Sequence, residues 1–314
     1  MELTSLIAEL GRASAPIVQA AVIAAARLRP VDSCLDERWL QRQPASPTRD
    51  RAAIRAVRAD LSRAYSLELA GDFATALTVA TTAREQARTM PDWPPLLADA
   101  LVREGNLLVQ AGDLAAAETA SAEAYYTAAS AGAWGLAAAA AIDLTSNVGD
   151  LQERFDHGRE WAKHARMTLV HAGDPEGLWE AARLNNLANI HQAAGEYGEA
   201  QALNERVVAI HEQILGPDHP KVGLSLLNLA HAHHKLDAHV EAQALYERAL
   251  RIFERALGSD HPRVAQALGH LATSYTATGK HAEARLLHER SLALTEKIYG
   301  ADHYHVANSL NNLA

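Results

Sequence analysis

The stretches GPDHPKVGLSLLNLA (216–230), GSDHPRVAQALGHLA (258–272) and GADHYHVANSLNNLA (300–314) are near copies of one another, 42 residues apart. A repeat of this length indicates stacked supersecondary units, each of which buries its apolar face on a neighbour. Repeat arrays usually act by presenting an extended surface. The search for function therefore turns from a catalytic cleft to a surface that binds a partner.

The repeat over 220–262 predicts two helices, the first of which begins near Pro220. Proline is tolerated in the first turn of a helix, and Asp218 just before it is the expected N-cap. Helical spacing predicts one face made of Val222, Leu226, Leu229, Ala230 and His233. The pattern stops at Asp237, where the neighbouring repeats have Gly195 and Gly279. A turn is predicted there.

The second helix of this repeat is expected to run from near His239 to Leu257, with Gly258 as a left-handed C′ residue. Its predicted apolar face contains Ala242, Leu245, Ala249, Ile252 and Ala256. The polar positions of the EAQ and YER triplets are expected to face water or the next unit.

One small residue follows each turn and lets the paired helices approach. It recurs every 41 or 42 residues as Ala76, Ala117, Gly158, Ala200, Ala242 and Ala284. This register predicts six helical hairpins and the first helix of a seventh, which breaks off at Ala314. We expect that last helix to fray or to pack against another molecule, because solenoid ends normally need a polar capping element.

The composition is that of an ordinary soluble protein, with 48% hydrophobic and 21% charged residues. The net charge of −9 argues against nucleic-acid binding, which needs a basic face. A single cysteine, Cys34, fits a reducing compartment. The longest apolar stretch, Ile17–Leu28, is about half a membrane span. A cytoplasmic location away from membranes is predicted.

Three segments are predicted along the chain. Residues 1–50 contain two short helices, Glu2–Leu10 and Ile17–Leu28, and a polar connector. These helices are expected to cap the first repeat, and the alternative is a linker from something upstream. Residues 51–177 form degenerate repeats, and 178–314 form regular repeats, of which the last is truncated.

The pattern L-x-N-L-A, G-x-Y-x-E-A, L-x-x-R-A-L and L-G-x-D-H-P resembles the tetratricopeptide repeat in its 42-residue form, as in kinesin light chains. The resemblance is specific over 178–314 and looser over 51–177. It implies an all-α fold, a right-handed α-solenoid of about six and a half antiparallel helix pairs with a short N-terminal helical cap. The first helices would line a concave groove.

The whole chain also resembles the carboxy-terminal region of bacterial serine/threonine protein kinases that carry tetratricopeptide arrays. The order of short helices, connector, degenerate repeats, the REWAKHA stretch (159–165) and regular repeats supports this resemblance. The sequence has no Gly-rich phosphate loop, no H-R-D and no D-F-G. The resemblance therefore implies a sensor or docking module of a kinase.

Asparagines on the first helices are the leading candidates for partner binding: Asn185, Asn186, Asn189, Asn228, Asn311 and Asn312. The amide offers donors and an acceptor, which suits an extended peptide backbone. The resemblance implies that such asparagines clamp peptide main chain or a terminal carboxylate. The alternative is hydrogen bonding between neighbouring helices.

Histidine is abundant, with 16 residues. His231 and His234 are one helical turn apart, and His270 lies on the next first helix. We expect these three, with Lys235, to add selectivity to partner binding. No carboxylate or cysteine stands at ligand spacing, so no metal or other cofactor is predicted. His233 is expected to pack inside the repeat, and His219, His261 and His303 of the repeated Asp-His turn are expected to be structural. A surface that gains charge as the pH falls is favoured over a metal site.

The sequence contains no G-x-S-x-G, H-E-x-x-H or G-x-x-x-x-G-K-[ST] motif. The predicted function is therefore a non-catalytic scaffold that binds a peptide or protein partner in the concave groove. Two alternatives stay open, the regulatory region of a bacterial serine/threonine protein kinase and a self-association module.

Overall fold

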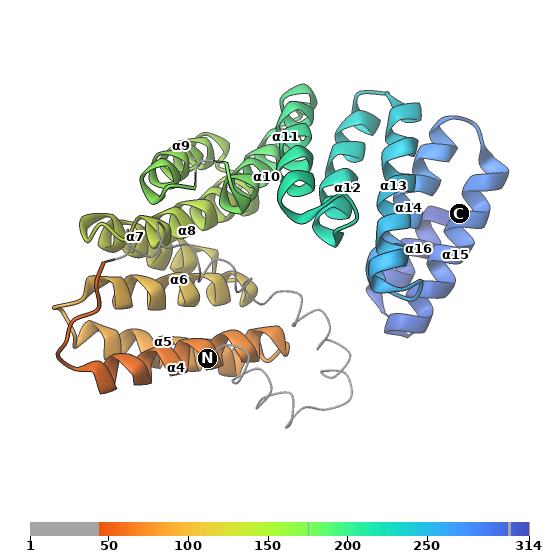
Figure 1. The fold of residues 1–314 in the computed structure, drawn as a ribbon. Helices are drawn as coiled ribbons and strands as arrows, with labels where there is room; N and C mark the ends of the chain where they lie inside the picture. The colour runs from red at the N-terminus through yellow and green to blue at the C-terminus, as the bar shows by residue number, and fades with distance from the viewer. Residues whose placement is uncertain (1–43, 175, 301–302, 314) are drawn as a thin grey trace. The chain divides into compact units, whose positions relative to one another are not determined.

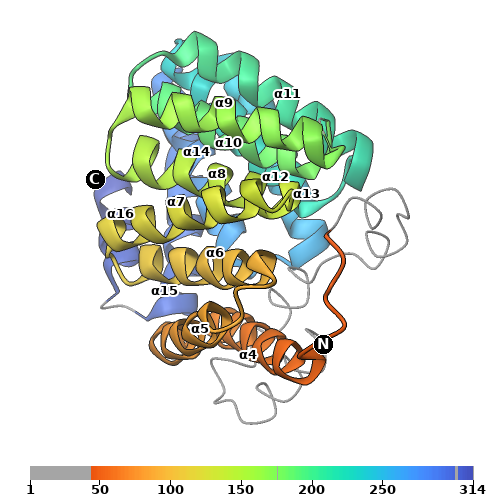
Figure 2. The ribbon, with the colours of Figure 1, turned by 90° about the vertical axis from the view of Figure 1, so that its left-hand side faces the viewer.

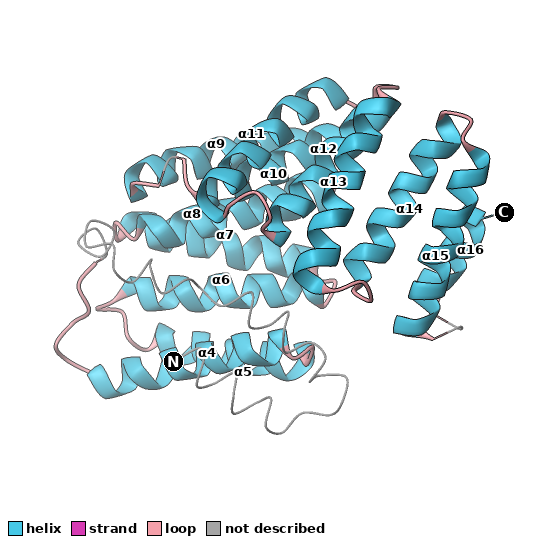
Figure 3. Ribbon diagram, turned by 45° about the vertical axis from the view of Figure 1, so that its right-hand side comes forward, coloured by secondary structure: helices cyan, strands magenta, loops and turns pink. Residues whose placement is uncertain are grey.

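The computed structural model describes residues 44–174, 176–300 and 303–313, which form helices without a β-strand (Figure 3). The helices are α4 (Arg51–Leu69), α5 (Phe73–Arg88), α6 (Pro94–Gln110), α7 (Leu114–Ser130), α8 (Trp134–Leu144), the π-helix η2 (Thr145–Leu151), α9 (Phe155–Ala172), α10 (Leu178–Ala193), α11 (Tyr197–Leu215), α12 (Pro220–Lys235), α13 (His239–Leu257), α14 (Pro262–Ala277), α15 (His281–Tyr299) and α16 (Tyr304–Leu313). The two predicted N-terminal helices and Cys34 lie outside the described residues.

The chain divides into two compact units, the first ending at Pro175 and the second beginning at Glu176. Unit 1 contains α4 to α9, which Figure 2 shows as successive layers. Unit 2 contains α10 to α16, and its helices also stand side by side (Figure 1). Each helix packs on the next one along its unit. The six predicted hairpins and one further helix are confirmed.

The small residues of the predicted register lie where the two helices of each hairpin meet. The five alanines, from Ala76 to Ala284, are at most 3% exposed. Gly158 is also buried. The helix limits follow the same register, because α13 runs from His239 to Leu257 as predicted.

The turns between paired helices need a positive φ at one residue. Gly195 and Gly279 have φ of 78° and 75°, and Asp237 has φ of 59°. Aspartate is one of the few non-glycine residues that tolerate this region. The turn predicted at Asp237 is confirmed.

Asp218 is not the N-cap of α12. The cap is His219, whose ring Nδ1 accepts the Lys221 N–H at 3.1 Å. The extended backbone of His219 (φ −74°, ψ 139°) brings the ring back over the first turn. Asp218 instead pairs with Arg255 at 3.4 Å. The sequence predicted the start of α12 correctly but assigned its N-cap to the wrong residue.

Two predictions about α13 need correction. Gly258 has φ 87° and ψ 157°, which is not left-handed helical but a region that is nearly exclusive to glycine. Ala256, expected on the buried face, is exposed. The burial runs instead through Tyr246 and Phe253, which are 2% and 0% exposed. These larger rings reach the neighbouring first helices, so they fill the space that a straight alanine stripe would leave.

Among the polar residues of α13, Gln243 and Arg248 bind neighbouring hairpins of the same unit. Gln243 donates to the Ser274 carbonyl at 3.1 Å. Arg248 pairs with Glu212 at 2.5 Å in the preceding hairpin, and Arg290 pairs with Glu254 at 2.6 Å one repeat later. Such partly exposed pairs each contribute little free energy. Their repetition helps to set the register between hairpins.

The π-helix η2 ends the first helix of the third hairpin. Its Asn147 is buried and donates to the Leu114 carbonyl at 3.1 Å. π-Helical turns change the phase of the residues that follow, and they are frequent at functional sites. The third first helix therefore presents different positions from those of the other repeats.

We predict that Ala242→Leu lowers the free energy of unfolding by about 1–3 kcal/mol, because the added methylene groups overpack the contact between α12 and α13. Ala242 is fully buried, whereas Ala244 is exposed on the same helix. Ala244→Leu is therefore the matched control. Urea unfolding measures both variants, and equal midpoints would show that the register is wrong.

Candidate functional site

In five of the six hairpins, polar or aromatic side chains occupy the two first-helix positions that lie 14 and 11 residues ahead of the small packing residue. They are Ser62 and Tyr65 on α4, Arg103 and Asn106 on α6, Asn186 and Asn189 on α10, Asn228 and His231 on α12, and His270 and Thr273 on α14. The third hairpin has the buried Leu144 and Asn147 at these positions. We call the ten residues of the other five hairpins the first-helix face of their unit. All ten are polar or aromatic with a polar group, and all except the exposed Thr273 are half-buried. Half-buried polar side chains are typical of a surface that can bind another molecule.

In unit 2, side-chain hydrogen bonds join the first helices α10 and α12. The Asn228 amide donates to Asn185 Oδ1 at 2.9 Å. One turn further on, His231 Nδ1 lies 2.9 Å from Gln192 Oε1. Hydrogen bonding between neighbouring helices, one of the two predicted roles, is thus present. An amide pair of this kind still has donors and acceptors for a ligand, because each amide offers two of both.

Four imidazoles lie together on α12, α13 and α14 of unit 2, and we call His231, His234, His239 and His270 the imidazole cluster. The Nδ1 atoms of His234 and His239 are 3.2 Å apart. The ring of His270 stacks on Tyr246, with centroids 5.6 Å apart and an angle of 14° between the planes. His239 and Tyr246 were not predicted, since both belong to a second helix.

Three members of the imidazole cluster, His231, His234 and His270, have lowered pKa values, which favours their uncharged form at neutral pH. Burial lowers the pKa of His270 to about 4, and repulsion from His231 and His234 adds to this effect. Burial also lowers the pKa of His231, with Lys235 and His234 contributing. The pKa of His234 falls through burial and through repulsion from His239 and Lys235.

The remaining predicted site residues are Lys235, Asn311 and Asn312. Lys235 is exposed in the last turn of α12, and Asn311 is exposed on α16. The side chain of Asn312 lies outside the described residues. In the part of the chain that the structure describes, no three His, Cys, Asp or Glu side chains are grouped to hold a metal ion.

Asn204 on α11 is a polar residue that the sequence reasoning missed. It is 0% exposed, and neither atom of its amide has a hydrogen-bond partner among the described residues. It occupies the register position of Tyr246 and His288 in the next two hairpins. The sequence could have revealed it, because the aligned position of the next two repeats holds an aromatic ring and Asn204 does not.

Unit 1 carries a charged cluster on its first helices, which was also missed. Arg103 donates to Glu68 at 2.9 Å, and its guanidinium lies 4.5 Å from the Tyr65 ring centroid. Asp143 on α8 is hydrogen-bonded to Asn106. Arg103 and Asn106 stand in the same register as Asn228 and His231, so the repeat itself could have pointed to them.

Burial raises the pKa of Asp143 to about 7. Repulsion from Glu68 adds to this effect, whereas the Asn106 hydrogen bond and the Arg103 charge oppose it. Asp143 thus titrates close to neutral pH on the first-helix side of unit 1.

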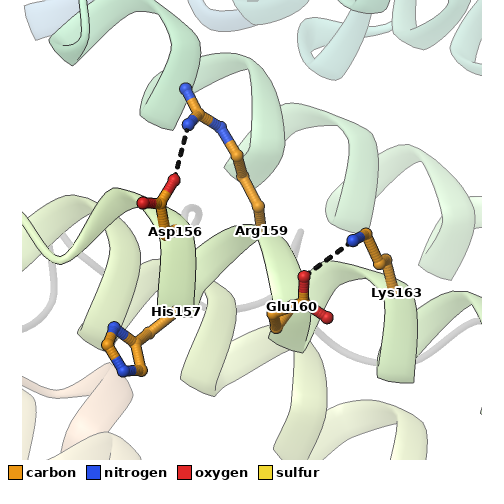
Figure 4. A pocket seen from close by; sticks show the side chains of 5 residues that line it. All are labelled: Asp156, His157, Arg159, Glu160 and Lys163. Atoms are coloured by element: carbon orange, nitrogen blue, oxygen red, sulfur yellow. Dashed lines mark hydrogen bonds and ion pairs between the residues drawn. The ribbon is translucent and has the colours of Figure 1, made fainter.

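Two hollows in unit 1 lie away from this cluster. One, of about 360 Å³, is lined only by α9 residues from Asp156 to Lys163 (Figure 4). Its Arg159–Asp156 and Lys163–Glu160 pairs, at 3.0 and 2.7 Å, neutralise each other. The other, of about 310 Å³, lies beside Trp93, whose buried indole N–H has no partner among the described residues. Neither hollow brings together side chains that could act jointly on a ligand.

We predict that Asn204→Leu raises the free energy of unfolding by about 1–2 kcal/mol, because it removes a buried amide that has no hydrogen-bond partner among the described residues. Asn204→Asp should lower it, since a buried charge without a partner is costly. Thermal unfolding of both variants beside the parent is the measurement. A loss of stability in Asn204→Leu would show that the amide has a partner.

We predict that pH affects the two units in opposite directions. The folded-state pKa of His270 lies below the unfolded value of about 6.5, so unit 2 loses stability as the pH falls from 6.5 towards 4. The folded-state pKa of Asp143 lies above the unfolded value of about 4, so unit 1 loses stability as the pH rises from 4 to 7. We expect effects of about 1–2 kcal/mol.

Hydrogen exchange of the intact chain at pH 5 and pH 7.5, corrected for intrinsic exchange rates, measures the stability of each unit separately. His270→Gln should remove part of the pH dependence of stability in α12 to α14. Asp143→Asn should remove part of the pH dependence of stability in α6 to α8. A dependence of the same sign in both units would contradict the prediction.

The sequence model of the tetratricopeptide repeat matches residues 180–255, 224–297 and 263–314. No curated protein sequence matches the chain. Among solved structures, the chain is similar to BtubC (BKLC) from P. vanneervenii, with 22% identity, a TM-score of 0.62, and coverage of 71% of this chain and 91% of that one. A putative kinesin light chain from Podosopora anserina has 24% identity, a TM-score of 0.56, and coverage of 65% and 96%.

A third similar structure covers almost the whole chain. It is a Rap protein complexed with Competence and Sporulation Factor, with 13% identity, a TM-score of 0.58, and coverage of 99% of this chain and 84% of that one. At such identities the structural likeness shows the fold. The predicted relation to protein kinases stays a prediction. Unit 2 is an array of tetratricopeptide repeats, and the helix hairpins of the chain have the fold of a tetratricopeptide solenoid.

Proposed function

We propose that the protein is a non-catalytic scaffold that binds a peptide or a partner protein on its first-helix face. The observation that carries the proposal is the recurrence of polar side chains, nine of ten half-buried, at two first-helix positions in five of the six hairpins. Some of these groups join neighbouring hairpins, as Asn228 does through Asn185. A binding surface also needs polar groups, because a partner's backbone must exchange its water for hydrogen bonds.

The amides of unit 2 suit an extended peptide. Asn186, Asn189 and Asn228 are spaced along two adjacent first helices, and each amide can donate to a carbonyl and accept from an N–H. The Asn185–Asn228 bond, at 2.9 Å, holds two of the amides in place before a partner arrives. Preorganised side chains cost less entropy on binding than mobile ones.

The Rap structure adds support at the level of the fold. That protein is complexed with Competence and Sporulation Factor, and its fold extends over 99% of this chain. The helix arrangement is thus compatible with binding a partner. No helix in the described residues is long and apolar enough to cross a membrane.

We predict that Asn186→Ala combined with Asn228→Ala weakens partner capture about tenfold, which corresponds to the loss of about 1.4 kcal/mol of hydrogen bonding. The immobilised full-length chain is used for capture, and mass spectrometry identifies and quantifies the partners. Glu199→Ala with Glu241→Ala is the matched control, because both glutamates are exposed on second helices.

Circular dichroism should show unchanged helicity in both double variants. Equal capture by the parent and the asparagine variant would assign binding to the second helices or the loops.

A further inference from the structure

The imidazole cluster of unit 2 lies directly beside the asparagines of the proposed binding surface. His231 follows Asn228 by one helical turn on α12, and its ring is held by Gln192 of α10. His270 belongs to the first-helix face on α14. A partner that reached Asn228 would therefore meet imidazoles next.

The groups around the cluster supply almost no negative charge. From α10 it meets the neutral Gln192, and from α13 the neutral Tyr246 and its own member His239. The positive charge of Lys235 acts on both His231 and His234. The carboxylate that acts on the cluster is Asp237, whose side chain is 94% exposed and 3.7 Å from His239.

Another histidine of the same unit is paired closely with a carboxylate. His191 Nδ1 lies 2.5 Å from a Glu196 carboxylate oxygen, so a proton on that ring has a partner. Among the residues that the structure describes, no carboxylate contributes to the pKa shift of His231 or His270. The charged groups that act on them are other histidines, with Lys235 acting on His231. The cluster would therefore be stabilised by an anion brought from outside.

We propose that the imidazole cluster is a proton-coupled binding site for a carboxylate of the partner, either an acidic side chain or a chain end. The proposal rests on the proposed function. Carboxylate binding would favour protonation of His231 and His234, which then donate charge-assisted hydrogen bonds. The protein takes up protons as the partner binds, so the affinity rises as the pH falls from 7.5 to 5.5.

Three synthetic peptides test the proposal with the full chain. The first is a hexaglutamate blocked at both ends, and the second is a hexaserine with a blocked amino end and a free carboxyl end. The third is a hexaglutamine blocked at both ends, which carries no charge. Titration calorimetry at pH 5.5 and 7.5, in two buffers of different ionisation enthalpy, gives both the affinity and the protons taken up.

We expect a carboxylate peptide to bind about tenfold more tightly at pH 5.5 than at 7.5, with uptake of about one proton. Preference for hexaglutamate would identify acidic side chains as the ligand, and preference for the free-ended hexaserine would identify a chain end. His231→Gln with His234→Gln should abolish the pH dependence, because glutamine keeps hydrogen bonding without titrating. His157→Gln, exposed on α9 of unit 1, should behave like the parent.

Several results would overturn the proposal. One is equal binding of hexaglutamine and the carboxylate peptides, and another is an affinity that does not change with pH. A pH dependence that persists in the double histidine variant would trace the effect to the net charge of the protein. Binding of none of the peptides would also overturn it. The proposed function would then be judged separately, by partner capture in the asparagine variant at a single pH.

Discussion

The close approach of two helices at one small residue is the constraint on which the hairpins depend. Six such residues, 41 or 42 positions apart, are buried between paired helices. A larger side chain at any of them would push its pair of helices apart. Since each hairpin buries its apolar face on the next, one displaced pair would disturb the neighbouring contacts as well.

This packing also explains why the first helices can carry function. Their apolar side chains are used up by the paired helix and by the next hairpin, as with Val222 and Leu226, which are at most 1% exposed. The positions of Asn228 and His231 are left half-buried, so their residue type is not set by packing. Polar residues at these positions cost little stability and have hydrogen-bonding groups for the partner that we propose.

Much of the fold could be predicted because the period repeats local signals. Pro220, the turn at Asp237 and the glycine at 258 mark helix limits that any single repeat would show only weakly. The N-cap was misassigned because Asp and His stand side by side, and only the backbone angles of His219 decide between them. The contact of His270 with Tyr246 was also beyond reach, since it joins successive hairpins and depends on their packing.

The two units use the same positions for different chemistry. Where unit 2 has Asn228 and His231, unit 1 has Arg103 and Asn106, with Glu68 and the titrating Asp143 in contact. In the same unit, Asn147 of the π-helix η2 packs against α7, where it donates to the Leu114 carbonyl at 3.1 Å. Unit 1 therefore offers a carboxylate and a guanidinium, and unit 2 offers amides and imidazoles.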